Sequence, residues 1–546
     1  MAWKQPLLAA AVAATLHAQT ATLVIRNARI WTGDPKNPWA DSLTATEDMI
    51  TRVGNVPADA PVAPGARIVD AKGRLVTPGF IDSHTHLIEA GLRMKSVKLR
   101  DAKTKKDFVD RIARFAAGRP EGAWIAGGDW DHENWGGELP TRQWIDAVTP
   151  KNPVWIQRLD GHMGLANSLA LRAAKVVRET PAAPGGTIVR DAKGEPTGVF
   201  KDNAMAIVEK AKPGAAAGEV REAAANATKE LLRNGVTSAH HMGSNNSDLS
   251  VFEAVRADGQ LGVRVFVAAP LEQWKPVDKL TFDGYGDRWI RWGTFKAFLD
   301  GSLGSHTAAF DEPYTDSPKD SGFFVSSPNT IFDQAFTVDA RGMFVAVHAI
   351  GDRANRVLLS VFEKILQTSN QKAHRFRIEH AQHLHAADIP RMAKANVIAS
   401  MQPYHLIDDG RWAEKAIGAE RAKTSWAFRS MIDAGVTLAF GSDWFVAPPS
   451  VMEGIYAAVT RRTLDGKHPG GWVPEQKITV EEALRAYTAG GAYAAVEEAY
   501  KGVLAPGKLA DLAMLSEDIF KIDPARIKDV QVDMTIVGGA VAFERR

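Results

Sequence analysis

The chain has 546 residues, which exceeds one average domain, although a single barrel with additions would use the whole length. Its net charge of +2 gives no reason to expect nucleic acid or a membrane surface as a partner, and its 45% hydrophobic content is ordinary for a globular protein. Cysteine is absent, which excludes disulfides, thiolate metal sites and cysteine nucleophiles. Any metal must therefore be bound by His, Asp, Glu or a modified side chain.

Residues 1–18 have the features of a secretory signal peptide. One lysine precedes a short core rich in Ala and Leu, and the sequence "LHAQ" offers a cleavage point after Ala18. The apolar core is too short to anchor the chain in a bilayer. We therefore expect an exported protein, periplasmic or secreted, and the alternative is a cytoplasmic protein with an Ala-rich tail.

Two β-rich segments lie at opposite ends of the chain. Residues 21–33 and 65–79 alternate apolar and polar side chains around Gly turns, and residues 507–518 and 530–544 have the same pattern. Short β segments of this kind are unstable alone. We therefore predict that residues 19–78 and 501–546 pair into one small β-sandwich.

Between these segments, short apolar strands alternate with helical patterns. This alternation is typical of a parallel sheet with helices outside it, and eight strands suit a TIM-like barrel. The fold class predicted for residues 79–500 is therefore α/β, a (β/α)8 barrel. The expected strands lie in residues 79–87, 235–243, 262–269, 293–301, 343–352, 376–382, 397–403 and 437–444.

The first interval of this barrel is far longer than one crossover requires. It contains a hairpin pattern at 184–200 and a Trp-rich stretch at 124–137. We predict that residues 98–234, approximately, form an inserted subdomain that leans over the mouth of the barrel.

The stretch "VTPGFIDSHTHL" places two histidines, His84 and His86, at the end of the first barrel strand. Residues i and i+2 of an extended strand point to the same side, so the two imidazoles converge. Two neutral imidazoles at one point suit a divalent metal. A pair of exposed loop histidines is the alternative for an isolated HxH pattern.

The other strand ends support the metal interpretation. Functional residues of a barrel lie at the C-terminal ends of its strands. Lys296 lies on the fourth expected strand, and His348, His380 and Asp443 follow on the fifth, sixth and eighth. Each has a structural alternative, such as a core histidine, a helix cap or a surface lysine. Their joint occurrence favours a metal site, more so for the histidines and Asp443 than for Lys296.

These motifs resemble the amidohydrolase superfamily, in particular its amidohydrolase-3 branch of YtcJ-like and N-substituted formamide deformylase-like proteins. The resemblance covers nearly the whole chain after residue 18. It is carried by "PGFIDSHTHL", "PGGTIVRDAKGEPTGV", "FLDGSLGSHTAAF", "VHAIGDRAN", "RIEHAQ", "SMQP", "GSDW" and "GKLADLAML".

The resemblance implies a metal centre in the barrel mouth. His84 and His86 would bind the more buried metal, and His348 and His380 would bind a second one. Asp443 would contact the first metal and take a proton from the shared water, which makes it the candidate catalytic base.

Lys296 matches a lysine that some relatives carry as a carbamate, N6-carboxylysine, bridging both ions. A lysine must lose its proton before it adds CO2, and two nearby dications would favour this. We expect a divalent metal at one or two ions per chain. Zinc is the default for a His-rich site without sulfur, although manganese, iron and cobalt would suit the same ligands.

Further residues are candidates for contact with the substrate. His162, in a "DGH" segment shared by family members, is the candidate catalytic donor to the oxyanion. The others would form the pocket wall or bind a substrate carboxylate, with a structural role as the alternative: Trp130, Asp131, Arg353 and Trp444.

Two residues depart from the family pattern. His241 and His306 stand where relatives often carry Asp and Arg, and they would reshape the substrate site or offer alternative ligands.

The function expected is hydrolysis of a C–N bond in a small amide-like substrate, such as an N-formyl or N-acyl amine. The alternatives are ester, lactone or cyclic imide hydrolysis, deamination, or a catalytically silent metal-binding relative. Dimerisation is common for such barrels, and nothing in the sequence decides it.

Overall fold

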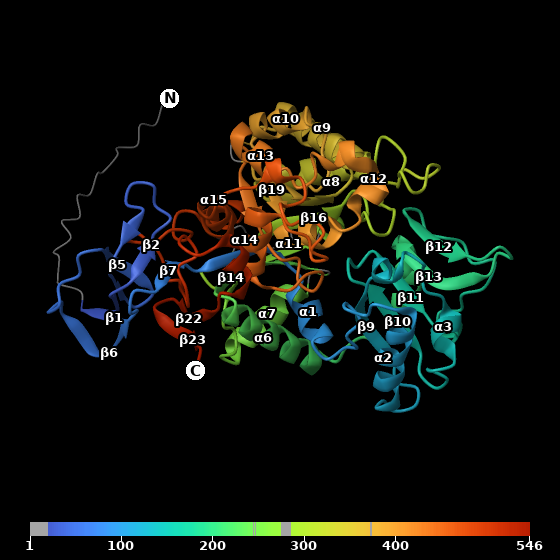
Figure 1. The fold of residues 1–546 in the computed structure, drawn as a ribbon, viewed down its shortest axis with the longest axis horizontal. Coiled ribbons are helices and arrows are strands. Elements are labelled where there is room, and N and C mark those ends of the chain that lie inside the picture. The colour runs from blue at the N-terminus through green and yellow to red at the C-terminus, as the bar shows by residue number, and fades with distance from the viewer. Residues whose placement is uncertain (1–19, 244, 246, 275–285, 372–373) are drawn as a thin grey trace, which may run out of the picture.

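The computed structural model describes residues 20–243, 245, 247–274, 286–371 and 374–546. The predicted signal peptide, residues 1–18, lies outside the described residues. A β-sandwich, a barrel and an inserted subdomain follow one another along the long axis of the molecule (Figure 1). Within the described ranges, no helix is long and apolar enough to cross a membrane.

The β-sandwich contains strands from both ends of the chain, as predicted. One sheet has the order β5-β4-β1-β6 and the other β23-β22-β21-β7-β2-β3. The two ends of the chain meet where β7 and β21 pair antiparallel. The first sheet comprises β1 (Ala21–Arg26), β4 (Leu43–Thr46), β5 (Met49–Val53) and β6 (Val62–Asp70). The second comprises β2 (Arg29–Trp31), β3 (Trp39–Ala40), β7 (Leu75–Pro78), β21 (Leu512–Leu515), β22 (Val532–Val537) and β23 (Ala540–Glu544).

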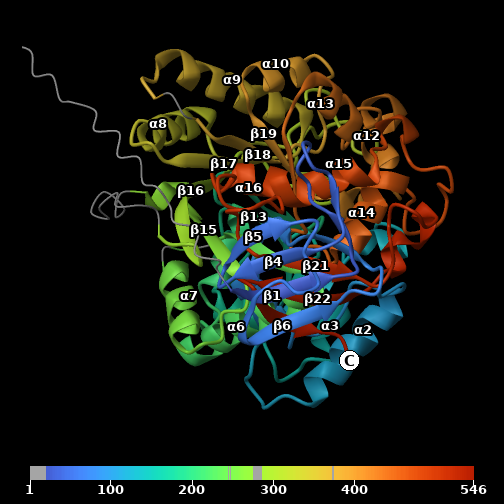
Figure 2. The ribbon, with the colours of Figure 1, turned by 90° about the vertical axis from the view of Figure 1, so that its left-hand side faces the viewer.

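The sandwich has its own apolar core and is joined to the barrel by polar contacts. Leu23 and Leu43 of one sheet are buried with Leu512 and Ile536 of the other. A buried ion pair of 2.8 Å joins the Arg264 side chain, on a barrel strand, to Asp511, beside β21. Figure 2 shows the sandwich strands in front of the barrel.

The eight predicted barrel strands are confirmed. They form one sheet in chain order in which every neighbouring pair is parallel. Because both faces of these strands are covered, almost all of their residues are buried, including the polar ones of the segments "FIDSHT", "VTSAHHM" and "FRIEH". The strands are β8 (Phe80–Thr85), β14 (Val236–Met242), β15 (Arg264–Pro270), β16 (Ile290–Phe298), β17 (Phe344–Ala349), β18 (Phe376–His380), β19 (Ile398–Met401) and β20 (Leu438–Phe440).

Amphipathic helices cover the outside of this sheet. In α9 (Asp352–Thr368), Leu358, Phe362 and Ile365 recur at helical spacing and are buried. The other long helices of the barrel wall are α6 (Ala217–Arg233), α7 (Asp248–Ala257), α8 (Pro328–Asp339) and α14 (Val451–Thr460). Shorter helices near the C-terminal half are α10 (Asp388–Lys394), α11 (Pro403–Asp409), α12 (Ala413–Ala422), α13 (Phe428–Ala434), α15 (Val480–Arg485) and α16 (Gly491–Ala494).

The insert after the first barrel strand is a subdomain with its own sheet, of order β12-β13-β11-β10-β9. The expected hairpin is the antiparallel pair β12–β13. The strands are β9 (Ile125–Trp130), β10 (Val154–Arg158), β11 (Met163–Ala166), β12 (Gly186–Arg190) and β13 (Pro196–Asp202). The helices between α1 (Leu87–Arg93) and the end of the insert are α2 (Lys105–Ala117), α3 (Arg142–Asp146), α4 (Ser168–Ala173) and α5 (Ala206–Glu209).

The insert ends earlier than the sequence suggested. We placed its end near residue 234, but α6 packs against α1 and against barrel strand β14. Helix α6 is therefore part of the barrel wall, and the subdomain ends before Ala217.

The first and last strands of the barrel meet through close backbone contact. The N–H of Asp443 donates to the carbonyl of His84 at 2.7 Å, and Thr85 pairs in parallel with Trp444. A Cβ added to Gly441 would lie 2.5 Å from the backbone nitrogen of His84. Closure at this point therefore requires glycine.

We predict that Gly441→Ala destabilises the protein by about 1–3 kcal/mol, because the extra carbon would push the first strand away from the last. Thermal unfolding measures this, and metal content should fall in parallel. The matched control is Gly470→Ala, since a Cβ at Gly470 meets no atom within 4 Å. Equal melting temperatures for the two variants would contradict the prediction.

Candidate metal centre

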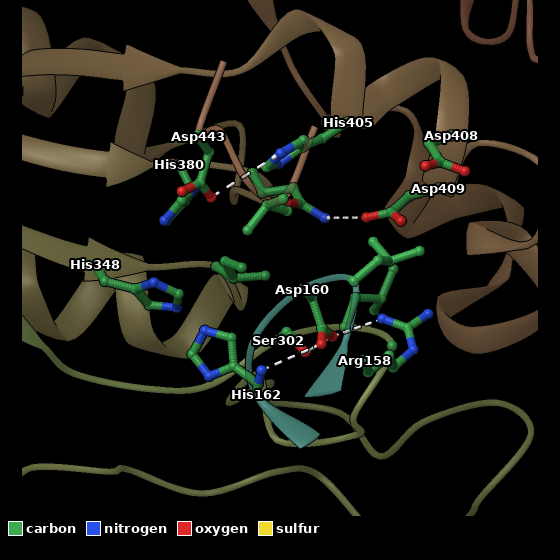
Figure 3. A pocket seen from close by; sticks show the side chains of 16 residues that line it. Arg158, Asp160, His162, Ser302, His348, His380, His405, Asp408, Asp409 and Asp443 are labelled. Carbon is green, nitrogen blue, oxygen red and sulfur yellow. Dashed lines mark hydrogen bonds and ion pairs between the residues drawn. The ribbon is translucent and has the colours of Figure 1, made fainter. Parts of the chain in front are cut away.

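A cavity of about 510 Å³ opens between the C-terminal ends of the barrel strands and the insert. Figure 3 shows an adjoining recess, in which His348, His380 and Asp443 of the barrel face His162 of the insert. The cavity is lined by all six side chains expected at the metal centre: His84, His86, Lys296, His348, His380 and Asp443.

The tightest group in this cavity contains two histidines and one carboxylate. Ligand atoms of His84, His380 and Asp443 lie within 4.8 Å of one another. Oδ1 of Asp443 is 3.1 Å from Nε2 of His86, and the rings of His380 and His348 have centroids 4.5 Å apart. Imidazole nitrogens and carboxylate oxygens at this spacing suit a divalent cation.

Hydrogen bonds on the outer nitrogens orient the two central rings. The Nδ1–H of His84 donates to the Glu379 carboxylate at 2.6 Å, and the Nδ1–H of His380 donates to the amide oxygen of Gln402 at 2.7 Å. Since both partners are acceptors, each Nδ1 carries the proton and each Nε2 keeps its lone pair. The rings are therefore held in the tautomer that a metal ligand needs.

Burial keeps these imidazoles neutral. It lowers the pKa of His84 to about 4 and the pKa values of His348 and His380 well below the usual range. The ring of His348 is held in the opposite orientation, because its Nε2–H donates to the carbonyl of Gly301 at 3.0 Å and leaves Nδ1 with the lone pair.

Three buried polar atoms at this point make no hydrogen bond with any residue that the structure describes. They are Nε2 of His84, Oδ1 of Asp443 and Nζ of Lys296. Buried polar atoms are normally satisfied, because an unmade hydrogen bond costs about 1–3 kcal/mol. A divalent cation would satisfy the first two, so the residues present fit a metal ion.

Lys296 lies at the edge of this group, near the end of β16. Its side chain is buried, which lowers the pKa of the ammonium to about 8, and Nζ lies 4.3 Å from the centroid of the Phe298 ring. A lysine of this kind supplies the neutral amine that carbamate formation requires. The modification itself stays a prediction.

Two residues of the group have strained backbones. His380 and Asp443 adopt φ angles of 76° and 58°, a region that costs about 1–3 kcal/mol for residues with a side chain. Both occur where a barrel strand ends, and the turn directs the side chain into the mouth. Such strain is concentrated at functional sites.

His162 reaches the cavity from the insert, as predicted from the "DGH" segment. Its Nδ1 bonds to Oδ1 of Asp202 at 2.6 Å, and its ring centroid is 4.9 Å from that of His348. Burial opposes a charge on His162, but the bond to Asp202 raises the pKa of the imidazole above its usual value. His162 is thus held as a hydrogen-bond donor beside the metal group.

The structure corrects two expectations for the pocket wall on the insert. Trp130 is fully buried in the core of the insert and donates its indole N–H to the carbonyl of Ile156 at 3.1 Å. Asp131 is 1% exposed and forms ion pairs of 2.9 Å with Arg158 and Arg411. Trp130 therefore stabilises the insert, Asp131 joins the insert to the barrel through Arg411, and neither lines the cavity.

Trp444 and Arg353 also lie away from the cavity. The carbonyl of Trp444 accepts the N–H of His86 at 2.7 Å, while its side chain lines a neighbouring depression. The guanidinium of Arg353 lies 4.9 Å from the ring centroid of Phe324, on the first turn of α9. The aromatic residues that line the cavity are instead Trp155, Phe298 and Phe445.

The two unusual histidines are engaged in the structure. His241 accepts the N–H of Leu87 on Nδ1 at 3.1 Å and contacts Asp248 through Nε2 at 3.2 Å, so both of its nitrogens are used. His306 stacks on Tyr314 with ring centroids 4.4 Å apart. Of the two expected roles, the structure rules out the free ligand for His241.

Sequence reasoning missed the partners that orient the ligands. Glu379 directly precedes His380 in "RIEHAQ", and Gln402 stands in "SMQP"; both motifs were noted without assigning these two residues a role. Nothing in the sequence marks Asp202. His405 was missed as well, and its Nε2 lies 4.0 Å from Oδ2 of Asp443 (Figure 3).

Comparison with known proteins places the chain in a family. The family model Amidohydro_3, described as "Amidohydrolase family", matches residues 67–543. The chain is 38% identical to Protein LONG AFTER FAR-RED 3 of Arabidopsis thaliana, with 95% of this chain and 91% of that protein covered. It is 32% identical to YtcJ of Bacillus subtilis (strain 168), with 88% and 92% covered. The chain therefore belongs to the amidohydrolase family, in the predicted amidohydrolase-3 branch.

Two further similarities extend over nearly the whole chain. N-substituted formamide deformylase of Arthrobacter pascens is 27% identical, with 96% of this chain and 99% of that protein covered. The crystal structure of an uncharacterized metal-dependent hydrolase from Pyrococcus horikoshii OT3 aligns with a TM-score of 0.74 at 27% identity, covering 92% of this chain and 99% of that one. The barrel and its additions thus recur in a solved structure.

We predict that Glu379→Gln lowers the affinity for a divalent metal about 10–100-fold, because the carboxylate that orients His84 is lost. Titration of metal-free protein measures this. The control is Glu363→Gln, which removes a carboxylate paired with Arg391 at 2.7 Å on the outer helices. Unchanged affinity in Glu379→Gln would show that His84 is oriented without it.

Proposed function

We propose that this chain is a metal-dependent hydrolase that cleaves a C–N bond in a small amide-like substrate, such as an N-formyl or N-acyl amine. One observation carries the proposal: the six predicted ligands line a single cavity in which three buried polar atoms of the set make no hydrogen bond with any described residue. The similarity to N-substituted formamide deformylase supports the C–N class.

The residues that would hold the metal divide into two sets. His84, His86 and Asp443 would hold one ion, and His348 and His380 would hold a second. Lys296, as N6-carboxylysine, would bridge two ions. Zinc is the default for such ligands, and a bound ion would lower the pKa of a water toward neutrality and polarise the substrate carbonyl.

The chain's own residues supply the proton transfers and the oxyanion contact. Asp443 is buried at the centre of the cavity and would accept the proton of the attacking water, then return it to the departing amine. His162, whose Nδ1 is held by Asp202, would donate from Nε2 to the oxygen that gains negative charge.

Ester, lactone or imide hydrolysis and deamination remain alternatives on the same residues. A catalytically silent relative is disfavoured because both Asp443 and the candidate donor His162 line the cavity beside the ligands. The remaining parts of the proposal are a small-molecule substrate without nucleic acid or membrane as partner, export of the chain, and assembly as a monomer or a homodimer.

We predict about two metal ions per chain in the purified protein, falling to one or none in Lys296→Ala, because the bridge is lost. Elemental analysis measures this, and chelation should abolish hydrolysis of N-formyl and N-acyl amines. One ion in both proteins would instead indicate a mononuclear site without a role for Lys296. No ion after reconstitution would refute the proposed function.

We predict that His162→Ala lowers kcat about 10²–10³-fold on the best amide substrate, the usual cost of removing one oxyanion donor. Metal content should be unchanged, since His162 is not assigned as a ligand. His374→Ala is the matched control, because this histidine bonds to Asp339 at 2.7 Å away from the cavity. A rise in KM alone, with kcat preserved, would contradict the assignment of His162 as a donor.

A further inference from the structure

A positively charged side chain, that of Arg93, lies on the wall of the same cavity. The ring of Phe445 lies between it and His86, one of the six candidate metal ligands. Arg93 is the last residue of α1 and lines the cavity with the six candidate ligands. The carbon at the centre of its guanidinium lies 3.4 Å from the ring centroid of Phe445, and that ring lies 5.7 Å from the ring of His86. Phe445 therefore separates Arg93 from the nearest ligand.

The hydrogen-bond partners of Arg93 are neutral. One Nη–H donates to the carbonyl of Gly128 at 3.1 Å, and the other Nη donates to the side-chain oxygen of Gln157. Within the described ranges, no carboxylate oxygen forms an ion pair with Arg93. Burial lowers the pKa of the guanidinium to about 10, so Arg93 remains charged at neutral pH.

Three carboxylates lie near Arg93 and favour its charge, those of Asp129, Glu89 and Glu209, but none of them is in direct contact with the guanidinium. Asp129 accepts the backbone N–H groups of Leu99 and Arg100. Glu209 accepts hydrogen bonds from the indole of Trp155 at 2.5 Å and from the amide of Gln157 at 2.9 Å. It also pairs with Lys212 at 3.4 Å. Gln157 therefore links Glu209 to Arg93 and holds the guanidinium in place, while the charge of Glu209 is balanced by Lys212.

A guanidinium removed from water gains most from an anion in direct contact, and none of the carboxylates in the described part of the chain supplies that contact to Arg93. Arginine offers five N–H donors in a planar fork that matches a carboxylate. Two of its donors are used by Gly128 and Gln157, and the flat Phe445 ring supports the guanidinium plane. An anionic group that enters the cavity would gain charge-assisted hydrogen bonds that a neutral group cannot make.

We propose that Arg93 is a specificity-determining residue that binds a free carboxylate of the substrate. The enzyme would then act on amides that also carry a carboxylate, such as N-formyl or N-acyl amino acids. This inference rests on the proposed hydrolase function. It places the amide at the metal group and the carboxylate beyond Phe445. A substrate that lacks the carboxylate would leave Arg93 unpaired.

The test uses two probes that differ only in the carboxylate, N-formylphenylalanine and N-formylphenethylamine. The metal-loaded protein should cleave the acid with the higher kcat/KM. In Arg93→Gln, kcat/KM for the acid should fall about 10–100-fold, mainly through KM, because a charge-assisted hydrogen bond is lost. The value for the neutral amide should change less than about threefold, and Arg93→Lys should restore part of the preference.

The control is Lys212→Gln, which removes a cation that is already paired with Glu209. It should leave the preference for the acid intact. Thermal unfolding of all three variants identifies any that fail to fold. If Arg93→Gln does not fold, Arg93→Lys carries the test, because it keeps the charge but loses the planar fork and should reduce the preference for the acid without abolishing it; an unchanged preference would then overturn the role of Arg93.

The outcomes separate this inference from the proposed function. Equal losses on both probes in Arg93→Gln, or equal activity of the unaltered protein on both, would overturn the role of Arg93 while hydrolysis stands. If neither probe is cleaved, calorimetric binding of N-formylphenylalanine decides: binding that Arg93→Gln abolishes supports the carboxylate site, and absence of binding overturns it.

Discussion

The contact between the first and last barrel strands is the constraint on which the site depends. Asp82, in β8, accepts the N–H and the hydroxyl of Ser442 at 2.8 and 2.6 Å. The neighbouring residue Asp443 donates its N–H to the carbonyl of His84. These bonds close the barrel and hold the carboxylate of Asp443 against the imidazole of His84. Without them, the two halves of the ligand set would lie on separate edges of an open sheet.

A buried polar network lies beneath the ligands. Removing its charged groups from water costs free energy, and the network supports the metal centre in return. Arg377 binds Glu379 at 2.7 Å, the carbonyl of Ser83 at 2.7 Å and Nδ1 of His240 at 3.1 Å. A buried ion pair often stabilises a fold less than apolar residues of the same volume would. Here it keeps Glu379 ionised and aligned, and Glu379 in turn orients His84. The network thus connects the barrel core to the metal centre through Arg377, Glu379 and His84.

The insert completes a site that the barrel alone leaves open. It supplies His162 with its partner Asp202, and it supplies Gln157, which holds Arg93 against Phe445. The barrel thus contributes the residues suited to bind metal, while the insert contributes groups placed to contact the rest of a substrate. A division of this kind allows substrate preference to change without disturbing the ligands.

The sequence by itself determined the barrel, the sandwich from both chain ends, and the six candidate ligands. Strands that are covered on both faces are mostly apolar, so a histidine or aspartate at the end of such a strand can be recognised from the sequence alone. The HxH pair of His84 and His86 follows from the two-residue repeat of a strand. The hairpin at 184–200 could also be predicted, because a hairpin depends on the residues of its own turn and not on distant contacts.

Only the tertiary structure decided which other polar residues serve the site. Trp130 and Asp131 look like pocket residues in a Gly-rich segment, yet Trp130 packs inside the insert and Asp131 joins the insert to the barrel through Arg411. Asp202 and Arg93 carry no local signal, yet Asp202 orients His162 and Arg93 lines the cavity. The end of the insert was also misjudged, because α6 has the same pattern whether it packs on the insert or on α1. Local periodicity shows that a residue faces a core or a strand end, but which distant element it meets depends on how the elements pack together.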